Sequence, residues 1–390
     1  MEVNVLKSNL SNVSKFYINL IEHLVGRNLK VFMAYALDEK VRYSSASGGV
    51  ATALFKYLLE KDHVEAILLP KLRFKHGLAY GVWSIVRNPD EISKYSGSIY
   101  APTFGFSKML TYTLNKFRRI AIITLPCQAK AVKKLLNAQK LNGDIFIIGL
   151  YCNNVPSMLA TKYALKAFNI QVEDVEFLSY RGRGWPGYIT IKTKSTTIYV
   201  PSPLFWDSGF GQYFYERSCY LCNDQTNSSA DLSLADPWTL PHEPIRKLGG
   251  ATLVIARSEK GLKVFENAIR SGYIVAAEID PIYAIQSATL LKCSKKILRR
   301  VSREWKLPPS FTTLTYELTY SFGHILASRE RLWPLLRLYH RIIIPLLLTA
   351  ASALDYKLKT TWAKINNYIT SIQNMKIPKN TFFMSTHKTH

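Results

Sequence analysis

Cysteine is scarce in this sequence. The chain has five cysteines in 390 residues, and none of them occurs before residue 127. The first residues contain no basic stretch followed by an apolar run, so we expect no signal peptide and a cytoplasmic protein. Thiols stay reduced in that compartment, which disfavours a disulfide framework. The cysteines are therefore available as ligands or as ordinary small side chains.

Acidic residues are also in short supply. Asp and Glu number 27 against 51 Lys and Arg, which gives a formal net charge of +24. Such an excess implies an affinity for an anionic partner. The aromatic residues are not interleaved with Arg and Lys in a short module, so nucleic acid is disfavoured. Together with the cysteines described below, the charge favours an anionic redox cofactor or an acidic electron-transfer protein, and partner subunits are a further option.

The C-terminal region has no apolar run long enough to span a bilayer. Residues 342–354 form an uncharged run that falls short of the about 20 residues a membrane-spanning helix needs. We expect helices over 332–338 and 342–354. Arg341 and Lys357 flank the second helix, which favours peripheral contact of residues 332–354 with anionic lipid. Packing on another subunit and burial in a core are the alternatives.

Two cysteines follow predicted buried strands. Cys127 comes after the apolar run 120–125, and Cys152 comes after the run 145–150, with a helical pattern over 129–140 between them. A strand, a helix and a second strand predict a parallel βαβ unit, in which both cysteines lie at the carboxyl edge of the sheet. Open α/β sheets bind ligands at that edge. The alternative is that each thiol is a small buried side chain.

Cys219 and Cys222 supply a second pair. Two intervening residues allow both sulfurs to approach one ion. Together with Cys127 and Cys152 they make four soft ligands, which suit zinc, a [2Fe-2S] cluster or a [4Fe-4S] cluster. Spacing does not separate these outcomes.

Two predicted loops, residues 44–49 and 96–100, consist mainly of small residues. Residues 44–49 run directly into an amphipathic helical pattern at 50–59, where free backbone N–H groups and the helix dipole favour a phosphate. The alternative is a Ser N-cap followed by flexible glycines. Residues 96–100 repeat this chemistry and add Tyr100, which is suited to stacking or hydrogen bonding. A surface turn is the alternative there.

The segment 181–187 combines glycine, arginine and tryptophan. Gly184 and its neighbours allow close backbone approach, and Arg181 and Arg183 supply fixed positive charge for a carboxylate or phosphate. The alternative is a tight turn with Trp185 packed in a core. A strand at 175–180 precedes this segment, and a hairpin over 188–193 and 196–200 follows it.

The remaining patterns complete an α/β fold class. We expect a mixed, largely parallel sheet with helices on both faces, followed by a C-terminal helical extension. Further strands are predicted at 31–36, 66–70, 79–86, 230–235 and 250–256, and a helix begins at 258. The predicted divisions are a helical segment at 1–30, a first part at 31–118, a cysteine-bearing part at 119–290, a basic helical extension at 291–378 and a disordered tail at 379–390.

Over about residues 31–290 the sequence resembles the beta subunit family of coenzyme F420 hydrogenases and formate dehydrogenases. The resemblance rests on the order of short motifs rather than on any one of them. In chain order these motifs are Ser47-Gly48-Gly49, Gly97-Ser98-Ile99-Tyr100, Leu125-Pro126-Cys127-Gln128, Gly149-Leu150-Tyr151-Cys152, Arg181-Gly182-Arg183-Gly184-Trp185-Pro186-Gly187, Cys219-Tyr220-Leu221-Cys222-Asn223-Asp224 and Ala230-Asp231-Leu232-Ser233-Leu234-Ala235-Asp236-Pro237-Trp238.

The resemblance implies an iron-sulfur flavoprotein with FAD and a [4Fe-4S] cluster, and it leaves coenzyme F420 as a possible substrate. By motif, the cluster ligands would be Cys127, Cys152, Cys219 and Cys222. Residues near the flavin or its phosphates would be Ser47, Gly48, Gly49, Gly97, Ser98 and Tyr100. We add Arg183, Gly184 and Trp185 as cofactor-binding candidates, from the chemistry of their segment.

The expected function is electron transfer between a two-electron carrier, coenzyme F420 or similar, and one-electron centres. One alternative is a flavin-dependent reductase of an isoprenoid or tetrapyrrole double bond. A zinc-stapled interaction module without enzymatic activity is the other. The sequence departs from the family pattern in two respects: the first 126 residues lack the extra cysteine cluster of many relatives, and Ala235 stands where the family usually has glycine.

Overall fold

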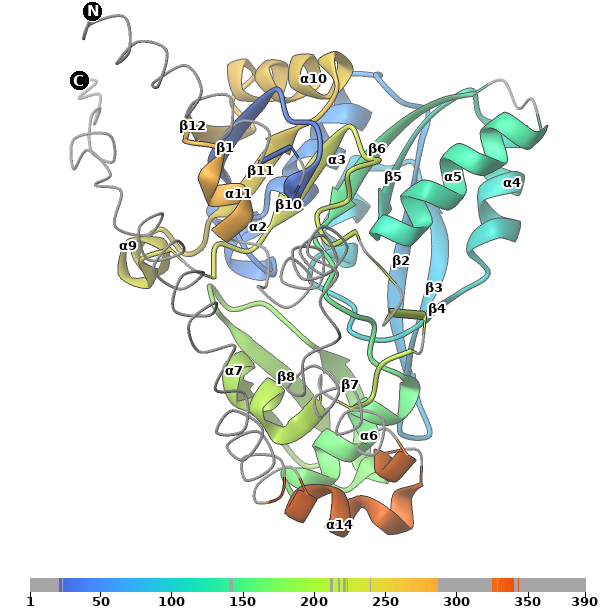
Figure 1. Cartoon of the computed structure of the whole chain (residues 1–390), viewed down its shortest axis with the longest axis vertical. Helices are drawn as coiled ribbons and strands as arrows, with labels where there is room; N and C mark the ends of the chain where they lie inside the picture. Colours follow the sequence, from blue (N-terminus) through green and yellow to red (C-terminus); the bar gives the residue numbers. More distant parts are fainter. Residues whose placement is uncertain are drawn as a thin grey trace, which may run out of the picture. The chain divides into compact units, whose positions relative to one another are not determined.

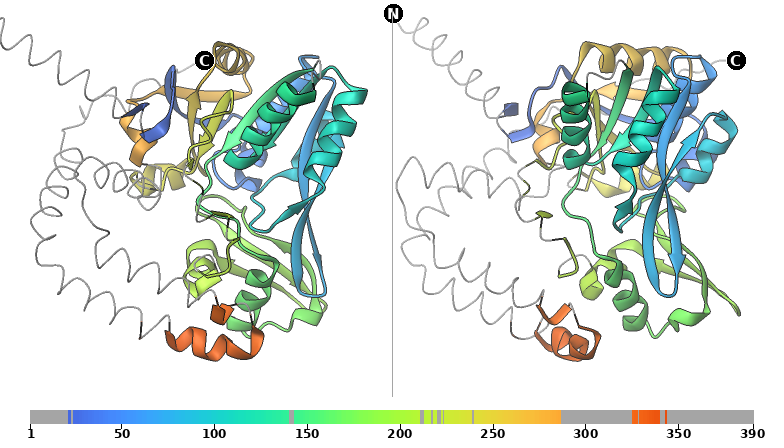
Figure 2. Two further views of the ribbon diagram at one scale, coloured as in Figure 1. Left: turned by 45° about the vertical axis from the view of Figure 1, so that its right-hand side comes forward. Right: turned by 90° about the vertical axis from the view of Figure 1, so that its right-hand side faces the viewer.

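The chain forms two compact units, Met1–Val301 and Ser302–His390. They are drawn in Figure 1 and, from two further sides, in Figure 2. The computed structural model describes residues 21–22, 24–139, 143–210, 213–216, 218–219, 222, 224–238, 240–286, 325–327, 329–339 and 343.

A mixed sheet is the centre of the first unit. Its strands are β1 (Lys30–Ala36), β2 (Ala66–Lys75), β3 (Leu78–Val86), β4 (Thr103–Phe104), β5 (Arg119–Thr124), β6 (Asp144–Leu150), β10 (Leu232–Ala235), β11 (Thr252–Ala256) and β12 (Ile274–Glu278). In the described part of the chain these nine strands pair in the order β12-β1-β11-β10-β6-β5-β2-β3-β4. Parallel pairing joins β10 to β6, β6 to β5, β5 to β2 and β3 to β4. The other neighbours are antiparallel.

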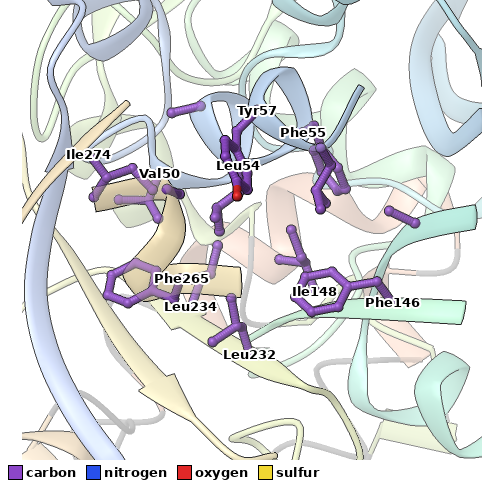
Figure 3. Close-up of a cluster of buried hydrophobic side chains, with 14 of the residues drawn as sticks. Val50, Leu54, Phe55, Tyr57, Phe146, Ile148, Leu232, Leu234, Phe265 and Ile274 are labelled. Atoms are coloured by element: carbon purple, nitrogen blue, oxygen red, sulfur yellow. The ribbon is translucent and has the colours of Figure 1, made fainter. Parts of the chain in front are cut away.

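Helices cover both faces of this sheet. Within the described residues, the helices of the first unit include α2 (Glu39–Ser44), α3 (Val50–Glu60), α4 (Phe106–Lys116), α5 (Pro126–Gln139), α6 (Met158–Ala167), α7 (Ser202–Phe205), α9 (His242–Lys247), α10 (Glu259–Arg270) and α11 (Ile282–Gln286). Successive strand residues point to opposite faces. Phe146 of β6 therefore packs with α3 and α10, whereas Ile147 packs with α4 and α5. Figure 3 shows the first of these cores, in which Leu54 of α3 and Phe265 of α10 are fully buried.

A smaller antiparallel sheet follows β6 along the chain. It consists of β7 (Val175–Ser179), β8 (Tyr188–Thr193) and β9 (Thr197–Pro201), in that order. Its buried face carries Leu178, Ile189, Ile191 and Val200. Figure 1 shows α6 and α7 beside this sheet. The connection from β7 to β8 is the Gly- and Arg-rich segment 180–187, whose contacts with the larger sheet are described below.

The structure confirms the mixed α/β class and the βαβ unit formed by β5, α5 and β6. The parallel part is confined mainly to the centre of the sheet, because β11 inserts between β1 and β10 and is antiparallel to both. The hairpin of β8 and β9 is also confirmed. Several elements of the first unit were not predicted from the sequence, namely α2, α4, α7, α9, α11, β4 and β12. Edge strands such as β4 and β12 are short or half-exposed, so their hydrophobic pattern is weak.

The second unit contains the short helix α14 (Trp333–Leu338), preceded by a helical turn at Glu330–Leu332. The helix predicted over 332–338 is therefore confirmed. Most of the run 342–354, the tail 379–390 and most of the N-terminal segment 1–30 lie outside the described residues, although residues 21–22 and 24–25 are helical. No helix in the described ranges has the length and apolar character needed to cross a membrane. The predicted membrane contact through 332–354 remains a prediction.

Candidate functional site

Two cysteines lie at the carboxyl edge of the parallel strands, as the βαβ pattern predicted. Cys127 is in the first turn of α5, directly after β5, and Cys152 follows the end of β6 by two residues. Cys127 is exposed and Cys152 is half-buried. Neither thiol is a fully buried core side chain, so the alternative interpretation of these two cysteines is wrong.

The segment of Cys219 and Cys222 lies against the residues that follow β6. The backbone N–H of Val155 donates to Sγ of Cys219 at 3.4 Å. The backbone N–H of Cys152 donates to the carbonyl of Gln225 at 2.9 Å. Both Cys219 and Cys222 are half-buried. Three of the four cysteines therefore belong to two adjoining loops.

The same loop also contacts α5, which carries Cys127. Nζ of Lys130, one turn after Cys127, lies 3.4 Å from Oδ2 of Asp224. Sγ of Cys222 donates to the Asp224 carbonyl at 3.2 Å. Asp224 is almost fully buried, and its carboxylate also accepts from the hydroxyl of Ser228 at 2.9 Å. Asp224 thus connects the Cys127 helix to the Cys222 loop.

The donor chemistry of these segments suits a soft metal or a cluster, because two thiols lie at the sheet edge and two belong to a segment that contacts it. They do not form a ligand group by themselves. Within the described residues, no three Cys, His, Asp or Glu side chains gather closely enough to hold a metal ion. Cys293, the fifth cysteine, lies outside the described residues.

Arg181 forms the centre of a second group of contacts beside this edge. Its side chain is 1% exposed. Nη1 donates to Oδ2 of Asp236 at 2.9 Å and to the hydroxyl of Tyr100 at 3.1 Å. Nε donates to the carbonyl of Pro186 at 3.1 Å, and Nη2 donates to the carbonyl of Ala46. The guanidinium therefore connects its own segment, at Pro186, to three segments that are distant in the sequence, at Ala46, Tyr100 and Asp236. We call this group the Arg181 junction.

Electrostatics keep the guanidinium of Arg181 charged. Burial by itself would lower its pKa, but the nearby Asp236 carboxylate and the Tyr100 hydroxyl raise it, and the net shift is upward. Arg181 also lies over the ring of Trp238, 5.4 Å from the ring centroid. Four of its five N–H donors have acceptors inside the protein. The carboxylate that Arg181 pairs with is therefore Asp236 of the protein itself, and a role of Arg181 toward a bound cofactor stays a prediction.

The two small-residue loops meet at this junction. Oγ of Ser96 lies 3.2 Å from Oγ of Ser45 and 3.0 Å from Oγ1 of Thr52, in the first turn of α3. Gly97 has a φ of +95°, and a Cβ on it would lie 3.6 Å from the carbonyl oxygen of Arg181. Ser98, which is half-buried, belongs to the same loop. The structure therefore brings the predicted residues of both loops together.

The loop before α3 packs closely against the sheet. The N–H of Gly48 donates to Oγ1 of Thr252 at 2.9 Å, and the hydroxyl of Ser47 donates to the Ala251 carbonyl. A Cβ on Gly48 would lie 2.8 Å from the carbonyl oxygen of Ala34. The N-cap of α3 is Gly49, which has a φ of +77° and no capping side chain. A Ser N-cap, the alternative interpretation, is therefore wrong.

The three candidates of the 181–187 segment have different environments. Arg183 is exposed and stacks over the ring of Tyr199, 4.3 Å from its centroid. The N–H of Gly184 donates to the carbonyl of Tyr43 at 2.9 Å. Trp185 is 4% exposed and belongs to a hydrophobic core, as the alternative interpretation predicted. Nε1 of Trp185 is nevertheless a buried donor that has no acceptor in the described part of the chain.

The Arg181 junction adjoins the cysteine edge. Leu234 of β10 is paired with Leu150 of β6 in parallel register, and the N–H of Tyr151 donates to the Leu234 carbonyl at 2.8 Å. Asp236 and Cys152 therefore follow their strands at corresponding positions. Ala235, which stands where the family usually has glycine, is the last residue of β10 and is buried in the core.

A cavity of about 270 Å³ lies elsewhere, beside α2 and α3. It is lined by Leu37, Asp38, Val41, Ala53, Lys56, Gly272 and Tyr273. None of the four cysteines and no residue of the Arg181 junction lines it. We therefore assign the candidate site to the cysteine edge and the junction, on chemistry and not on cavity size.

Sequence reasoning missed three participants. Asn227 and Asp236 join separate segments through hydrogen bonds, and Asp224 does so through its ion pair with Lys130. Asp236 was visible as an acidic residue after a short strand. Its partner was not visible, because Arg181 is distant in the sequence and its chemistry alone suggests a binder of external anions.

Comparison with known proteins covers the whole of this region. Two family models described as "Coenzyme F420 hydrogenase/dehydrogenase, beta subunit" match the chain, the N-terminal model over residues 31–111 and the C-terminal model over residues 117–282. The two matches adjoin near the start of β5, and every candidate residue named above lies within them.

Curated relatives include subunits of two kinds of enzyme. The chain is 26% identical over 247 residues to the F420-dependent formate dehydrogenase subunit beta of Methanocaldococcus jannaschii, a match that covers 63% of this chain and 61% of the relative. It is 25% identical to a formate dehydrogenase 1 subunit beta of Methanococcus maripaludis, over 65% of this chain and 62% of the relative. It is 20% identical to the coenzyme F420 hydrogenase subunit beta of Methanosarcina barkeri, over 72% and 89%.

The match therefore spans less than two thirds of the length of the two formate dehydrogenase subunits. Among solved structures, a chain of the F420-reducing [NiFe] hydrogenase complex from Methanosarcina barkeri is similar, with a TM-score of 0.54 and 18% identity. That similarity covers 72% of this chain and 94% of the other. At this identity, the similarity establishes a shared fold.

Proposed function

This chain belongs to the coenzyme F420 hydrogenase/dehydrogenase beta subunit family, and we propose that it is an oxidoreductase of that type. In this proposal it transfers electrons between a two-electron carrier, coenzyme F420 or similar, and one-electron centres. FAD and a [4Fe-4S] cluster are the proposed resident cofactors. The names of the relatives support F420-linked redox chemistry, because each of them is F420-dependent or a coenzyme F420 hydrogenase subunit.

One observation carries the proposal. The segments of Cys127, Cys152, Cys219 and Cys222 are tied to one another by the contacts of Val155, Gln225 and Asp224 at one sheet edge. Thiolate ligands from distant segments are typical of iron-sulfur sites. Because metal binding and the folding of the ligand loops are coupled, closure of the four thiols around a cluster would accompany its insertion.

The adjoining Arg181 junction supports the flavin assignment. A flavin can accept two electrons as a hydride and pass them on one at a time to a neighbouring cluster. In this proposal, Ser47, Gly48 and Gly49 of one loop and Gly97, Ser98 and Tyr100 of the other contact the flavin. Arg181 holds the two loops together through Ala46 and Tyr100. The buried N–H of Trp185, which has no acceptor in the described part of the chain, is the donor that a ligand carbonyl or phosphate would satisfy.

Arg183 has a separate proposed role. Its side chain is exposed, and the face of its guanidinium lies over the Tyr199 ring. This stacking contact does not use the N–H donors, which lie around the edge of the guanidinium. A planar cation of this kind suits a phosphate or carboxylate group. We assign Arg183 to the anionic part of the bound cofactor or substrate. The excess of basic residues supports acidic partner subunits in the same way.

The experiment that tests this function begins with anaerobic purification of the full chain. We expect a yellow-brown protein that contains flavin, iron and sulfide and that transfers electrons to or from coenzyme F420. Cys219→Ser should lose iron and sulfide, whereas Cys293→Ser, which changes the one cysteine outside the ligand set, should retain them. A colourless protein containing zinc would contradict the proposal and favour an interaction module.

A further inference from the structure

Asn227 lies in the loop between Cys222 and β10, and it is fully buried. Its φ is +57°, in the left-handed region that Asn tolerates better than most residues. Its own carbonyl accepts from the N–H of Ala230 at 3.1 Å and from the hydroxyl of Ser233 at 3.0 Å. The backbone of Asn227 is therefore held in a tight turn that directs its side chain into the sheet edge.

The side-chain amide of Asn227 connects the ends of two parallel strands. Nδ2 donates to the carbonyl of Thr124, the last residue of β5, at 2.9 Å. It also lies 3.5 Å from the carbonyl of Leu150, the last residue of β6. Cys127 follows the first of these carbonyls by three residues, and Cys152 follows the second by two. One amide group thus reaches both strands at the points where the cysteine segments begin.

The fit around this amide leaves little room for movement. A Cβ on Gly149, the neighbour of Leu150, would lie 2.5 Å from Cγ of Asn227 and 2.6 Å from Nδ2. The absence of a side chain at Gly149 is therefore what admits the amide between the strands. Oδ1 of Asn227 is buried and accepts no hydrogen bond from the described residues. An apolar side chain at this position would not bury an oxygen without a hydrogen bond. The advantage of asparagine here therefore lies in the two N–H donors of its amide.

We propose that Asn227 is a positioning residue for the cysteine ligands. Its amide sets the separation between the β5 end, the β6 end and the loop of Cys219 and Cys222, and thereby the spacing of all four thiols. This inference rests on the proposed role of those thiols as cluster ligands. Groups that orient metal ligands without touching the metal affect both affinity and electronic properties of a site.

A merely structural role for Asn227 makes a different prediction. Loss of a buried hydrogen-bonding group lowers the stability of the protein wherever that group lies. It changes the metal site only if the group sets ligand geometry. The test therefore compares Asn227→Ala with Thr113→Val, which removes an equally buried hydroxyl whose bond to the Met109 carbonyl lies within α4.

The first measurement uses Co²⁺ alone with the cluster-free full chain, followed through the thiolate-to-cobalt absorption. We expect Asn227→Ala to weaken Co²⁺ binding by on the order of tenfold, while Thr113→Val leaves it unchanged. The second measurement uses the cluster-loaded protein. Asn227→Ala should change the EPR spectrum of the reduced cluster and accelerate iron loss to a chelator.

Unchanged Co²⁺ affinity and an unchanged EPR spectrum in Asn227→Ala would overturn the inference. If that variant does not fold, Asn227→Asp keeps the volume of the side chain while removing its amide donors, and the same two results apply to it. The proposed function is tested separately by Cys219→Ser. If Cys219→Ser still binds Co²⁺ and iron normally, the ligand assignment fails. If Cys219→Ser loses both metals but the Asn227 variants keep normal spectra, only the positioning role fails.

Discussion

Arg181 and Asp236 form an ion pair that is withdrawn from solvent. Nη1 of Arg181 lies 2.9 Å from Oδ2 of Asp236, and the two side chains are 1% and 18% exposed. The pair joins the β7–β8 connection to the end of β10. Removal of either partner would leave a buried charge without its counter-charge, which is far more costly than loss of a surface pair.

The first prediction concerns this pair. Asp236→Asn should lower the free energy of unfolding by about 3–5 kcal/mol, because the guanidinium of Arg181 stays buried and loses its counter-charge. The measurement is urea unfolding of the full chain. Lys194→Ala is the control, since Lys194 pairs with Asp174 at the surface, 3.2 Å away. It should cost no more than about 1 kcal/mol. Equal effects of the two substitutions would contradict the burial argument.

The second prediction separates the two arginines of the 181–187 segment. Arg183→Ala should leave the unfolding free energy within about 0.5 kcal/mol of the parent value, as is usual for exposed side chains. It should weaken binding of FAD or coenzyme F420 by roughly tenfold or more, because a charge-assisted hydrogen bond is worth about 1.5–3 kcal/mol. Fluorescence titration measures both affinities. Unaltered affinity for both ligands would remove Arg183 from the site.

The third prediction concerns the thiols and the fold. Cys127 is exposed, so Cys127→Ser should preserve far-ultraviolet circular dichroism and the unfolding midpoint of the cluster-free protein. The same variant should lose the iron-sulfur absorption. Cys152→Ser should behave in the same way, with a somewhat larger loss of stability because this residue is half-buried. Full iron and sulfide content in both variants would refute the ligand assignment.

The fourth prediction concerns Gly48. Its backbone does not have a positive φ, so the obstacle to a side chain there is space: a Cβ would lie 2.8 Å from the Ala34 carbonyl oxygen and 2.9 Å from Ala251. Gly48→Ala should therefore destabilise the protein by about 1–3 kcal/mol. It should also weaken flavin binding, because the loop before α3 must move. Flavin retention on gel filtration and thermal melting measure the two effects.

Gly105→Ala is the comparison for that experiment. Gly105 has a φ of +80° but no atom within 4 Å of the position of a Cβ. The substitution should cost about 1–2 kcal/mol of backbone strain and leave flavin binding unchanged. If Gly105→Ala also released the flavin, a general loss of stability would explain the result for Gly48→Ala, and the loop before α3 would lose its assigned role.

The cysteine edge was predictable because its signals are local. The apolar runs before Cys127 and Cys152 specify buried strands, and the helical pattern between them forces a right-handed parallel crossover. Once that unit is recognised, the two thiols must share an edge. The two-residue spacing of Cys219 and Cys222 is likewise a local feature. None of these conclusions needed knowledge of distant contacts.

By itself, the sequence determined the α/β class, the shared edge of Cys127 and Cys152 and the family resemblance, because periodicity and motif order are properties of neighbouring residues. Tertiary structure decided the insertion of β11 between β1 and β10 and the use of Arg181 as an internal counter-ion for Asp236. It also decided the close packing of the Asn227 side chain against Gly149. Each of these depends on segments far apart in the chain, and whether a charge or an amide faces solvent or another segment is fixed only when those segments pack together.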